Sequence, residues 1–298
     1  MKKTISIVLT IVLALSLALS LAACGSSGQE TVIRVGSKDF TENLIVGEIY
    51  ALALEDAGYK VERKLNIAGS VVHTAITSDE IDLYPEYTGT GLLSILQLPM
   101  SSDPDAVYDT VKAAYDEQFQ ITWLDSTAVN DTQGIAVRTE AAEQYGIHTL
   151  SDLQREAEHI RFCSQGEFEY REDGIPGLTA LYGPFDFASI NVYDNGIKYQ
   201  ILEQNEADAC PSYSTDAQLV NKDVFTYLED DKGFWPPYYL APIVRSELLE
   251  ANPEIAQILN AVSAKLDTET MVSLNAKVDI DHMEYEEVAR EFYETYCK

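Results

Sequence analysis

The 298-residue sequence is poor in positive charge. Twenty Lys and Arg residues face 49 Asp and Glu residues, so the formal net charge is -29 and the sequence pI is near 4.3. Because nucleic acid and anionic lipid surfaces bind basic patches, this balance argues against both as partners. The acidic residues are spread along the chain and form no tail, so a solvated acidic surface accounts for most of them.

Patterns typical of catalysis and metal binding are also missing. The four histidines are scattered, at His73, His148, His159 and His282. They do not have the H-x-x-x-H spacing of a zinc site, and the sequence contains no C-x-x-C, G-x-S-x-G or P-loop pattern. We therefore expect neither a metal nor a cofactor, and an exported hydrolase is the weaker alternative to a binding protein.

The first 23 residues have the composition of an export signal. Lys2 and Lys3 precede an uncharged apolar run from residue 5 to residue 23. This run ends in L-A-A-C, followed by G-S-S-G, which closely resembles bacterial lipoprotein signals that are cleaved before a lipid-modified cysteine. We expect residues 1–23 to be removed, Cys24 to carry the lipid and residues 24–31 to form a tether at the extracytoplasmic face of the cell membrane.

Three cysteines follow the expected anchor, at Cys163, Cys210 and Cys297. An oxidising exterior permits a disulfide, and Cys163 with Cys210 is the more plausible pair because both lie in short strand-like runs. Three free or buried thiols are the alternative.

Strand-like and helical patterns alternate along the mature chain. A strand at 32–35 is followed by a helix at 42–57, for which Thr41 is the expected N-cap. Further helices are expected at 104–119 and at 149–158. For the second of these, Thr149 or Ser151 is the expected cap. Alternation of this kind is typical of a doubly wound α/β sheet, which binds ligands at the carboxyl ends of its strands.

The order of these segments predicts two lobes. Residues 32–135 and 241–298 are expected to form lobe 1, and residues 136–240 are expected to form lobe 2. Two crossing strands would join them.

The stretch that carries most chemical information is I-D-L-Y-P-E-Y-T-G-T-G at 81–91. It places Tyr84 and Tyr87 beside the hydroxyls of Thr88 and Thr90. Tyrosine rings present faces of negative potential to a cation, and hydroxyls and amides can bind an anion. The stretch therefore suits ligand recognition. A strand end whose aromatic residues only pack in a core is the alternative interpretation.

Several motifs, in order, resemble the substrate-binding lipoproteins of bacterial osmoprotectant ABC importers, which capture glycine betaine, carnitine, choline or proline betaine. The motifs are G-S-K-D-F-T-E at 36–42, I-D-L-Y-P-E-Y-T-G-T at 81–90, E-F-E-Y-R-E-D-G-I-P-G-L at 167–178, Y-S-T-D at 213–216 and L-E-D-D-K-G-F-W-P-P-Y at 228–238. The resemblance implies a two-lobed periplasmic-binding-protein fold of type II with the ligand cleft between the lobes. It also implies a small zwitterionic or cationic solute, and permease and ATPase partners.

The resemblance implies a tyrosine cage for a quaternary ammonium group. Tyr87, Tyr213 and Tyr238 match three of its walls, and ring faces suit a cation whose N-methyl groups cannot donate hydrogen bonds. Binding chemistry of this kind leaves the ligand unchanged.

A second group of matching residues would hold the carboxylate of a betaine. Lys38, Thr90 and Arg171 occupy these positions, and the guanidinium suits a two-point contact. A salt bridge from Arg171 to its acidic neighbours is the alternative. A ligand without a carboxylate, such as choline, would leave Lys38 and Arg171 uncompensated, which modestly favours a zwitterion.

The sequence departs from the family pattern at 130–133. Many members carry N-N-T-Y there, whereas this chain reads N-D-T-Q, so Gln133 replaces a ring with an amide beside Asp131. Three other aromatic residues could supply a substitute wall, namely Tyr193, Trp235 and Tyr239. A different betaine such as ergothioneine is therefore an open alternative, because Gln133 could contact its ring nitrogen or sulfur.

Overall fold

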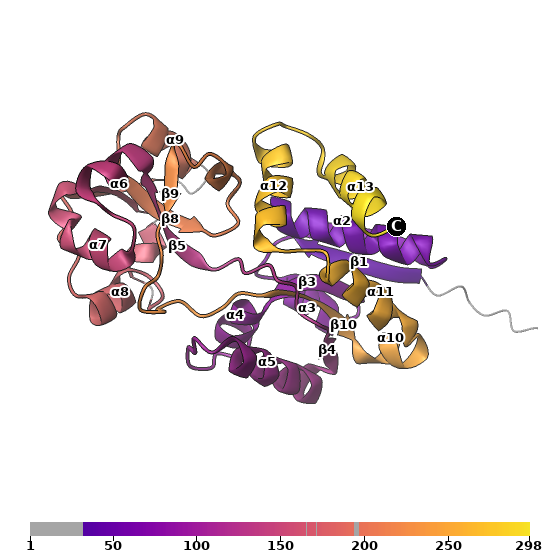
Figure 1. The fold of residues 1–298 in the computed structure, drawn as a ribbon. Helices are drawn as coiled ribbons and strands as arrows, with labels where there is room; N and C mark the ends of the chain where they lie inside the picture. The colour runs from indigo at the N-terminus through magenta and orange to yellow at the C-terminus, as the bar shows by residue number, and fades with distance from the viewer. Residues whose placement is uncertain (1–31, 165, 171, 194–196) are drawn as a thin grey trace, which may run out of the picture.

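The computed structural model describes residues 32–298 except residues 165, 171 and 194–196. Two five-stranded sheets lie in separate lobes, with helices on their faces (Figure 1). The strand order is β2-β1-β3-β10-β4 in lobe 1 and β7-β6-β8-β5-β9 in lobe 2. The two-lobed α/β architecture expected from the sequence is confirmed.

Lobe 1 is built from both ends of the described chain. Its first part comprises β1 (Val32–Lys38), α2 (Thr41–Asp56), β2 (Lys60–Ile67), α3 (Val72–Thr77), β3 (Leu83–Tyr87), α4 (Thr88–Thr90), η1 (Gly91–Ile95), α5 (Pro104–Phe119) and β4 (Ile121–Trp123). Its second part comprises β10 (Leu240–Arg245), α10 (Ser246–Ala251), α11 (Glu254–Ser263), α12 (Thr268–Asp279) and α13 (Tyr285–Tyr296).

Lobe 2 is formed by the segment between these parts. It comprises β5 (Gln133–Arg138), α6 (Thr139–Tyr145), α7 (Leu150–Arg155), η2 (Ala157–His159), β6 (Arg161–Ser164), η3 (Gly166–Glu169), α8 (Ile175–Tyr182), β7 (Ser189–Val192), α9 (Lys198–Glu203), β8 (Ala209–Tyr213), η5 (Ala217–Val220) and β9 (Phe225–Tyr227). The expected lobe limits at 135/136 and 240/241 fall inside β5 and β10. Each of these strands belongs as a whole to one sheet.

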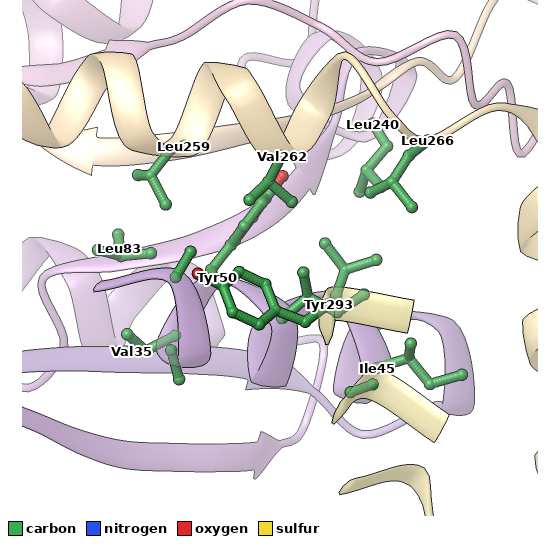
Figure 2. Close-up of a cluster of buried hydrophobic side chains, with 14 of the residues drawn as sticks. Val35, Ile45, Tyr50, Leu83, Leu240, Leu259, Val262, Leu266 and Tyr293 are labelled. Carbon is green, nitrogen blue, oxygen red and sulfur yellow. The ribbon is translucent and has the colours of Figure 1, made fainter. Parts of the chain in front are cut away.

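The core of lobe 1 forms around α2. Ile45, Ile49 and Tyr50 are fully buried between the first sheet and the C-terminal helices α11 to α13. Figure 2 shows Tyr50 surrounded by side chains from β3, β10 and α11. Burial raises the pKa of Tyr50 far above its ordinary value, since ionisation would place a charge among apolar groups. This packing fixes α2, whose first turn faces lobe 2.

The predicted N-cap of α2 is wrong. Thr41 is the first residue of the helix, and the cap position is held by Phe40, whose side chain makes no capping hydrogen bond. The Thr41 hydroxyl donates instead to Asp279 Oδ1 of α12, at 2.6 Å. A contact between segments far apart in the sequence therefore replaced the local one.

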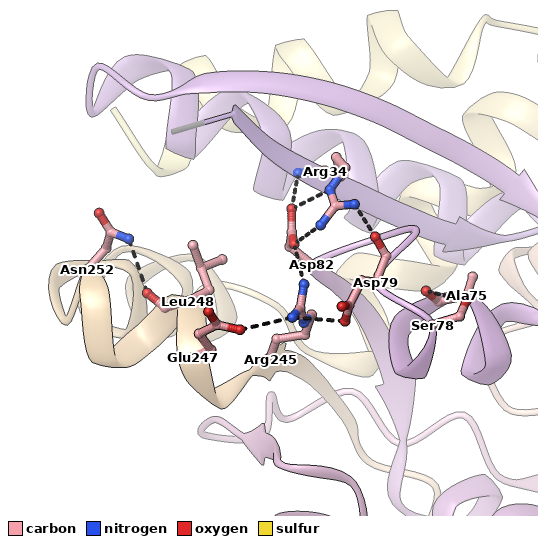
Figure 3. A network of polar contacts seen from close by, with 9 residues as sticks. All are labelled: Arg34, Ala75, Ser78, Asp79, Asp82, Arg245, Glu247, Leu248 and Asn252. Carbon is pink, nitrogen blue, oxygen red and sulfur yellow. Dashed lines mark hydrogen bonds and ion pairs between the residues drawn. The ribbon is translucent and has the colours of Figure 1, made fainter. Parts of the chain in front are cut away.

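The two lobes repeat one design. In lobe 1, Asp82 precedes β3 and accepts from Arg34 N and Nε at 2.7 and 2.9 Å, while Arg245 contacts it at 3.4 Å (Figure 3). In lobe 2, Asp208 precedes β8 and accepts from Arg161 N and Nε at 3.0 and 2.7 Å, and from Arg138 Nη2 at 2.8 Å.

The same repeat appears in the sequence once the structure aligns the strands. D-L-Y-P-E-Y at 82–87 corresponds to D-A-C-P-S-Y at 208–213. The first motif runs along β3, which is parallel to β1 and antiparallel to β10, and the second runs along β8, which is parallel to β6 and antiparallel to β5. Tyr87 and Tyr213 therefore occupy equivalent positions, each at the carboxyl end of its strand.

The cysteines of the described chain are free thiols. Cys163 on β6 and Cys210 on β8 are both buried in one apolar cluster of lobe 2, and Cys297 is half-buried in lobe 1. The expected disulfide between Cys163 and Cys210 is not formed, which matches the alternative of free thiols. Burial raises the pKa of Cys163 to about 11, so this thiol stays protonated.

The expected export signal, the lipidated Cys24 and the tether all lie outside the described residues. Across residues 32–298, apart from the gaps given above, no helix combines the length and the apolar character needed to cross a membrane.

Candidate functional site

A cavity of about 440 Å³ opens between the lobes, at the carboxyl ends of β1, β3 and β8. This is where an α/β sheet exposes backbone and side chains to a ligand. Its walls are Lys38, Phe40, Thr41, Glu42, Tyr87, Thr90, Ser94, Asp131, Gln133, Tyr213, Thr215, Asp216, Ala217, Tyr238, Asn275 and Asp279.

All predicted ligand residues that the structure describes line this cavity. They are Lys38, Tyr87, Thr90, Asp131, Gln133, Tyr213 and Tyr238. Arg171 lies outside the described residues, so the guanidinium half of the expected carboxylate contact stays a prediction.

Aromatic rings enter the cavity from both lobes. Tyr87 comes from β3, Tyr213 from β8 and Tyr238 from the segment that returns the chain to lobe 1. Tyr238 lies directly against Gly89, where a Cβ atom would meet the ring at 2.6 Å. Phe40 adds a further ring, 6.0 Å from that of Tyr87 between centroids. A glycine in the tyrosine motif therefore makes room for another wall of the cavity.

Carboxylates line the cavity together with the rings. The Tyr87 hydroxyl donates to Glu42 Oε1 at 2.7 Å. Burial raises the pKa of Glu42, and the hydrogen bond from Tyr87 only partly offsets it. Asp131 accepts from Thr215 Oγ1 at 2.7 Å, and exclusion of water by the surrounding protein, followed by the charge of Glu42, raises the pKa of Asp131. These acids would be stabilised in their charged forms by a cation in the cavity.

Tyr213 is held in place by a network of lobe 2. Its backbone N–H donates to Asp216 Oδ2 at 3.0 Å, and the same oxygen accepts from Tyr199 OH at 2.7 Å. The buried Lys198 pairs with Asp216 at 2.8 Å, and its Nζ lies 5.2 Å from the Tyr213 ring centroid. The tyrosine is thus positioned before any ligand arrives.

Lys38 already has a partner. Its ammonium forms an ion pair with Glu86, whose carboxylate also accepts from Tyr84 OH and from Tyr87 N, each at 2.8 Å. Both Lys38 and Glu86 are buried. A ligand carboxylate would therefore have to share Lys38 with Glu86, and the predicted role of Lys38 stays a prediction.

Gln133 lies opposite Tyr213 in the antiparallel pair of β5 and β8. Its amide Nε2 donates to Asp173 Oδ2 at 2.6 Å, so this nitrogen points to lobe 2. Trp235 donates from Nε1 to the Asp173 carbonyl at 2.9 Å. The amide that replaces the family tyrosine is thus held by a hydrogen bond within lobe 2.

The substitute walls considered from the sequence lie elsewhere. Trp235 and Tyr239 line a different cavity, of about 520 Å³, while Tyr193 packs against the apolar cluster around Cys210. Phe40 lines the ligand cavity instead.

The comparison with known families decides the class of this molecule. The family model OpuAC, described as the substrate binding domain of an ABC-type glycine betaine transport system, matches residues 31–295. The chain belongs to the OpuAC family.

Relatives of this OpuAC protein carry transport or binding names. It is 35% identical over 282 residues to a glycine-betaine-binding protein of Pseudomonas aeruginosa, covering 91% of this chain and 89% of that protein. It is 33% identical over 268 residues to the ergothioneine transport permease/ergothioneine binding protein EgtU of Helicobacter pylori strain G27. That match covers 89% of this chain and 48% of EgtU, so the chain spans about half of that relative.

A solved structure agrees with the family assignment. The crystal structure of a glycine betaine/carnitine/choline ABC transporter protein superposes with a TM-score of 0.82 at 27% identity, covering 88% of this chain and 97% of that one. This OpuAC protein is therefore a substrate-binding protein of the ABC-transport type, a class that works outside the cytoplasm.

Sequence reasoning missed several residues that line the cavity, namely Phe40, Glu42, Thr215, Asp216, Asn275 and Asp279. Phe40 and Glu42 lie inside the motif at 36–42, so a closer examination of that motif could have found them. Asn275 lies on α12 in no motif, and only the fold brings it to the cavity.

Proposed function

We propose that this protein captures a quaternary-ammonium compound in a cage of tyrosines and delivers it to a membrane permease. Glycine betaine, carnitine, proline betaine and choline are the candidate ligands. In this proposal Cys24 carries a lipid anchor, and an ATPase drives the permease. The protein binds and releases its ligand without changing it.

The observation that carries the proposal is the convergence of Tyr87, Tyr213 and Tyr238 on one cavity that is rich in carboxylates. The acids that line it are Glu42, Asp131, Asp216 and Asp279. Lys38, the amine in the same wall, is already paired. Ring faces bind an N-methylated cation that cannot donate hydrogen bonds, and nearby carboxylates add attraction in a site that excludes water.

The cation–π contacts of the rings alone do not supply enough free energy for micromolar binding. Three desolvated cation–π contacts at roughly 0.5 to 2 kcal/mol each supply about 2 to 6 kcal/mol. Micromolar capture needs about 8 kcal/mol net. Charge-assisted hydrogen bonds from Lys38 and Arg171 to a ligand carboxylate, at about 1.5 to 3 kcal/mol each, can supply the difference. The acids add Coulomb attraction for the cation.

One observation favours a ligand that also carries a hydrogen-bond donor, and ergothioneine is a second candidate of this kind. The Asn275 side chain lines the cavity, and its buried Oδ1 accepts no hydrogen bond within the described part of the chain. Glycine betaine and proline betaine have no donor to offer this oxygen, whereas an imidazole-type ring offers an N–H, and carnitine and choline offer an O–H.

Calorimetric titration with glycine betaine, carnitine, choline and ergothioneine, side by side, tests the proposal. We expect at least one to bind with a dissociation constant of about 1 μM or tighter. Preference for ergothioneine would support the second candidate. Failure of all four to bind would refute the proposed ligand class.

A further inference from the structure

Asn275 stands at the junction of the two lobes. Its helix, α12, is anchored in lobe 1 through the buried Met271 and Leu274, and it packs against η5 of lobe 2. Figure 1 shows α12 on the side of lobe 1 that faces lobe 2. Asn275 is only 5% exposed although it is polar. Burial of a polar side chain costs free energy unless hydrogen bonds replace those lost to water, so the partners of its amide are important.

One amide nitrogen joins the lobes. Asn275 Nδ2 donates to Glu42 Oε2 at 3.2 Å, within lobe 1, and to the Thr215 carbonyl at 2.9 Å, in lobe 2. The backbone carbonyl of Thr215 can only accept, so the nitrogen and not the oxygen of the Asn275 amide faces it. The opposite orientation of the amide would place its oxygen against another acceptor.

Both partners of Asn275 act directly on the cavity. Glu42 accepts the hydroxyl of the cage residue Tyr87, and Thr215 donates its own hydroxyl to Asp131. A chain of hydrogen bonds therefore runs from Tyr87 through Asn275 to Asp131 and crosses from one lobe to the other.

We propose that Asn275 is a positioning residue that links closure of the lobes to the geometry of the cage. The inference rests on the proposed function and deepens it. The contact with Glu42 lies within lobe 1 and survives when the lobes separate, whereas the contact with Thr215 exists only when they are together. Because only interactions that differ between two states shift their equilibrium, the Thr215 contact favours the closed form.

Two variants and a control test this role. Asn275→Ala removes the donor and some volume, and Asn275→Leu removes the donor with little loss of volume and adds no charge. Ser273→Ala, on the same helix, removes a hydroxyl that is exposed and bonds within the helix to the Glu269 carbonyl at 3.0 Å. Effects that follow the lost donor should appear in both Asn275 variants and be absent from Ser273→Ala.

Small-angle scattering of the purified, ligand-free protein reports lobe separation without requiring a known ligand. We expect both Asn275 variants to have a larger radius of gyration than wild type and Ser273→Ala. Stopped-flow dissociation of whichever quaternary amine binds wild type should be about two- to tenfold faster in Asn275→Ala, with an unchanged association rate.

The outcomes separate the two proposals. If wild type binds none of the four amines, the proposed function fails, and the scattering comparison alone decides the role of Asn275. If an amine binds but Asn275→Ala matches wild type in both scattering and dissociation rate, the role of Asn275 is refuted while the proposed function stands.

Discussion

Replacing Asp131 by asparagine should change affinity and stability in opposite directions. Asp131 lines the cavity, accepts from Thr215 Oγ1, and has a pKa raised first by exclusion of water and then by the charge of Glu42. Asn keeps the shape and the accepting oxygen, so Asp131→Asn removes little except the negative charge.

The size of both effects follows from electrostatics. A cation about 5 Å from the carboxylate gains about 3 kcal/mol at an effective dielectric constant of about 20, so affinity should fall by about a hundredfold or more. The ligand-free protein no longer has to hold a poorly solvated charge, so it should gain about 1 kcal/mol, or about 2 to 4 °C in Tm.

The gain in stability should depend on pH. A carboxyl with a raised pKa in the folded state contributes its full stability below the unfolded value of about 4, and this contribution is lost as pH rises through the folded pKa. Asp131→Asn should therefore match wild type at low pH and exceed it at neutral pH.

Calorimetry with the tightest amine and thermal melting of ligand-free protein, at several pH values, provide the measurements. Asp109→Asn on α5 is the control, because Asp109 is exposed and does not line the cavity, so solvent screens its charge. If Asp131→Asn kept full affinity, the cation would not lie beside Asp131. If the ligand-free variant melted below wild type at neutral pH, the buried charge of Asp131 would not be destabilising.

Three further predictions concern the cage and the lobe scaffold. Tyr213→Ala and Tyr238→Ala should each weaken amine binding by about tenfold or more with unchanged circular dichroism, and full affinity in both would contradict the cage. Gly89→Ala places a Cβ 2.6 Å from the Tyr238 ring, so its affinity should fall, and adding Tyr238→Ala should cost little more; additive losses would show that Gly89 acts otherwise. Although burial alone would raise the pKa of Asp208, hydrogen bonds from Arg161 and Arg138 lower it to about 2. Asp208→Asn should therefore lose about 2 kcal/mol at pH 7 in urea denaturation, and the wild-type advantage should disappear as pH falls from about 4 to 2; a constant difference across that range would point to packing instead.

Helices with strong local signals were predictable. The expected helix at 104–119 is α5, whose first residue is Pro104 and whose start is capped by Asp103 accepting from two backbone N–H groups. Thr149 caps α7 in a reciprocal capping box with Asp152, as one of the two expected caps. Where all the residues that mark the start of a helix lie within one turn, the sequence is enough to predict that start.

Contacts between distant segments limited the prediction. The Thr41 hydroxyl donates to Asp279, 238 positions later in the sequence, instead of capping α2. Lys38 has an acid partner in the tyrosine motif itself, yet the pairing of β1 with β3 is needed to bring the two together. Asn275 shows the extreme case, because no local pattern marks it and three segments must fold before it reaches the cavity.

The repeated strand motif has a consequence for how such a protein acquires new ligands. Two copies of one scaffold deliver Tyr87 and Tyr213 as a matched pair, but the residues that follow them differ, with T-G-T at 88–90 and S-T-D at 214–216. The two ends of a chemically asymmetric solute are then distinguished by these unlike triplets and not by the shared framework. Exchange of a few residues after the tyrosines would be enough to reverse or change the orientation in which such a solute binds, while both lobes keep their fold.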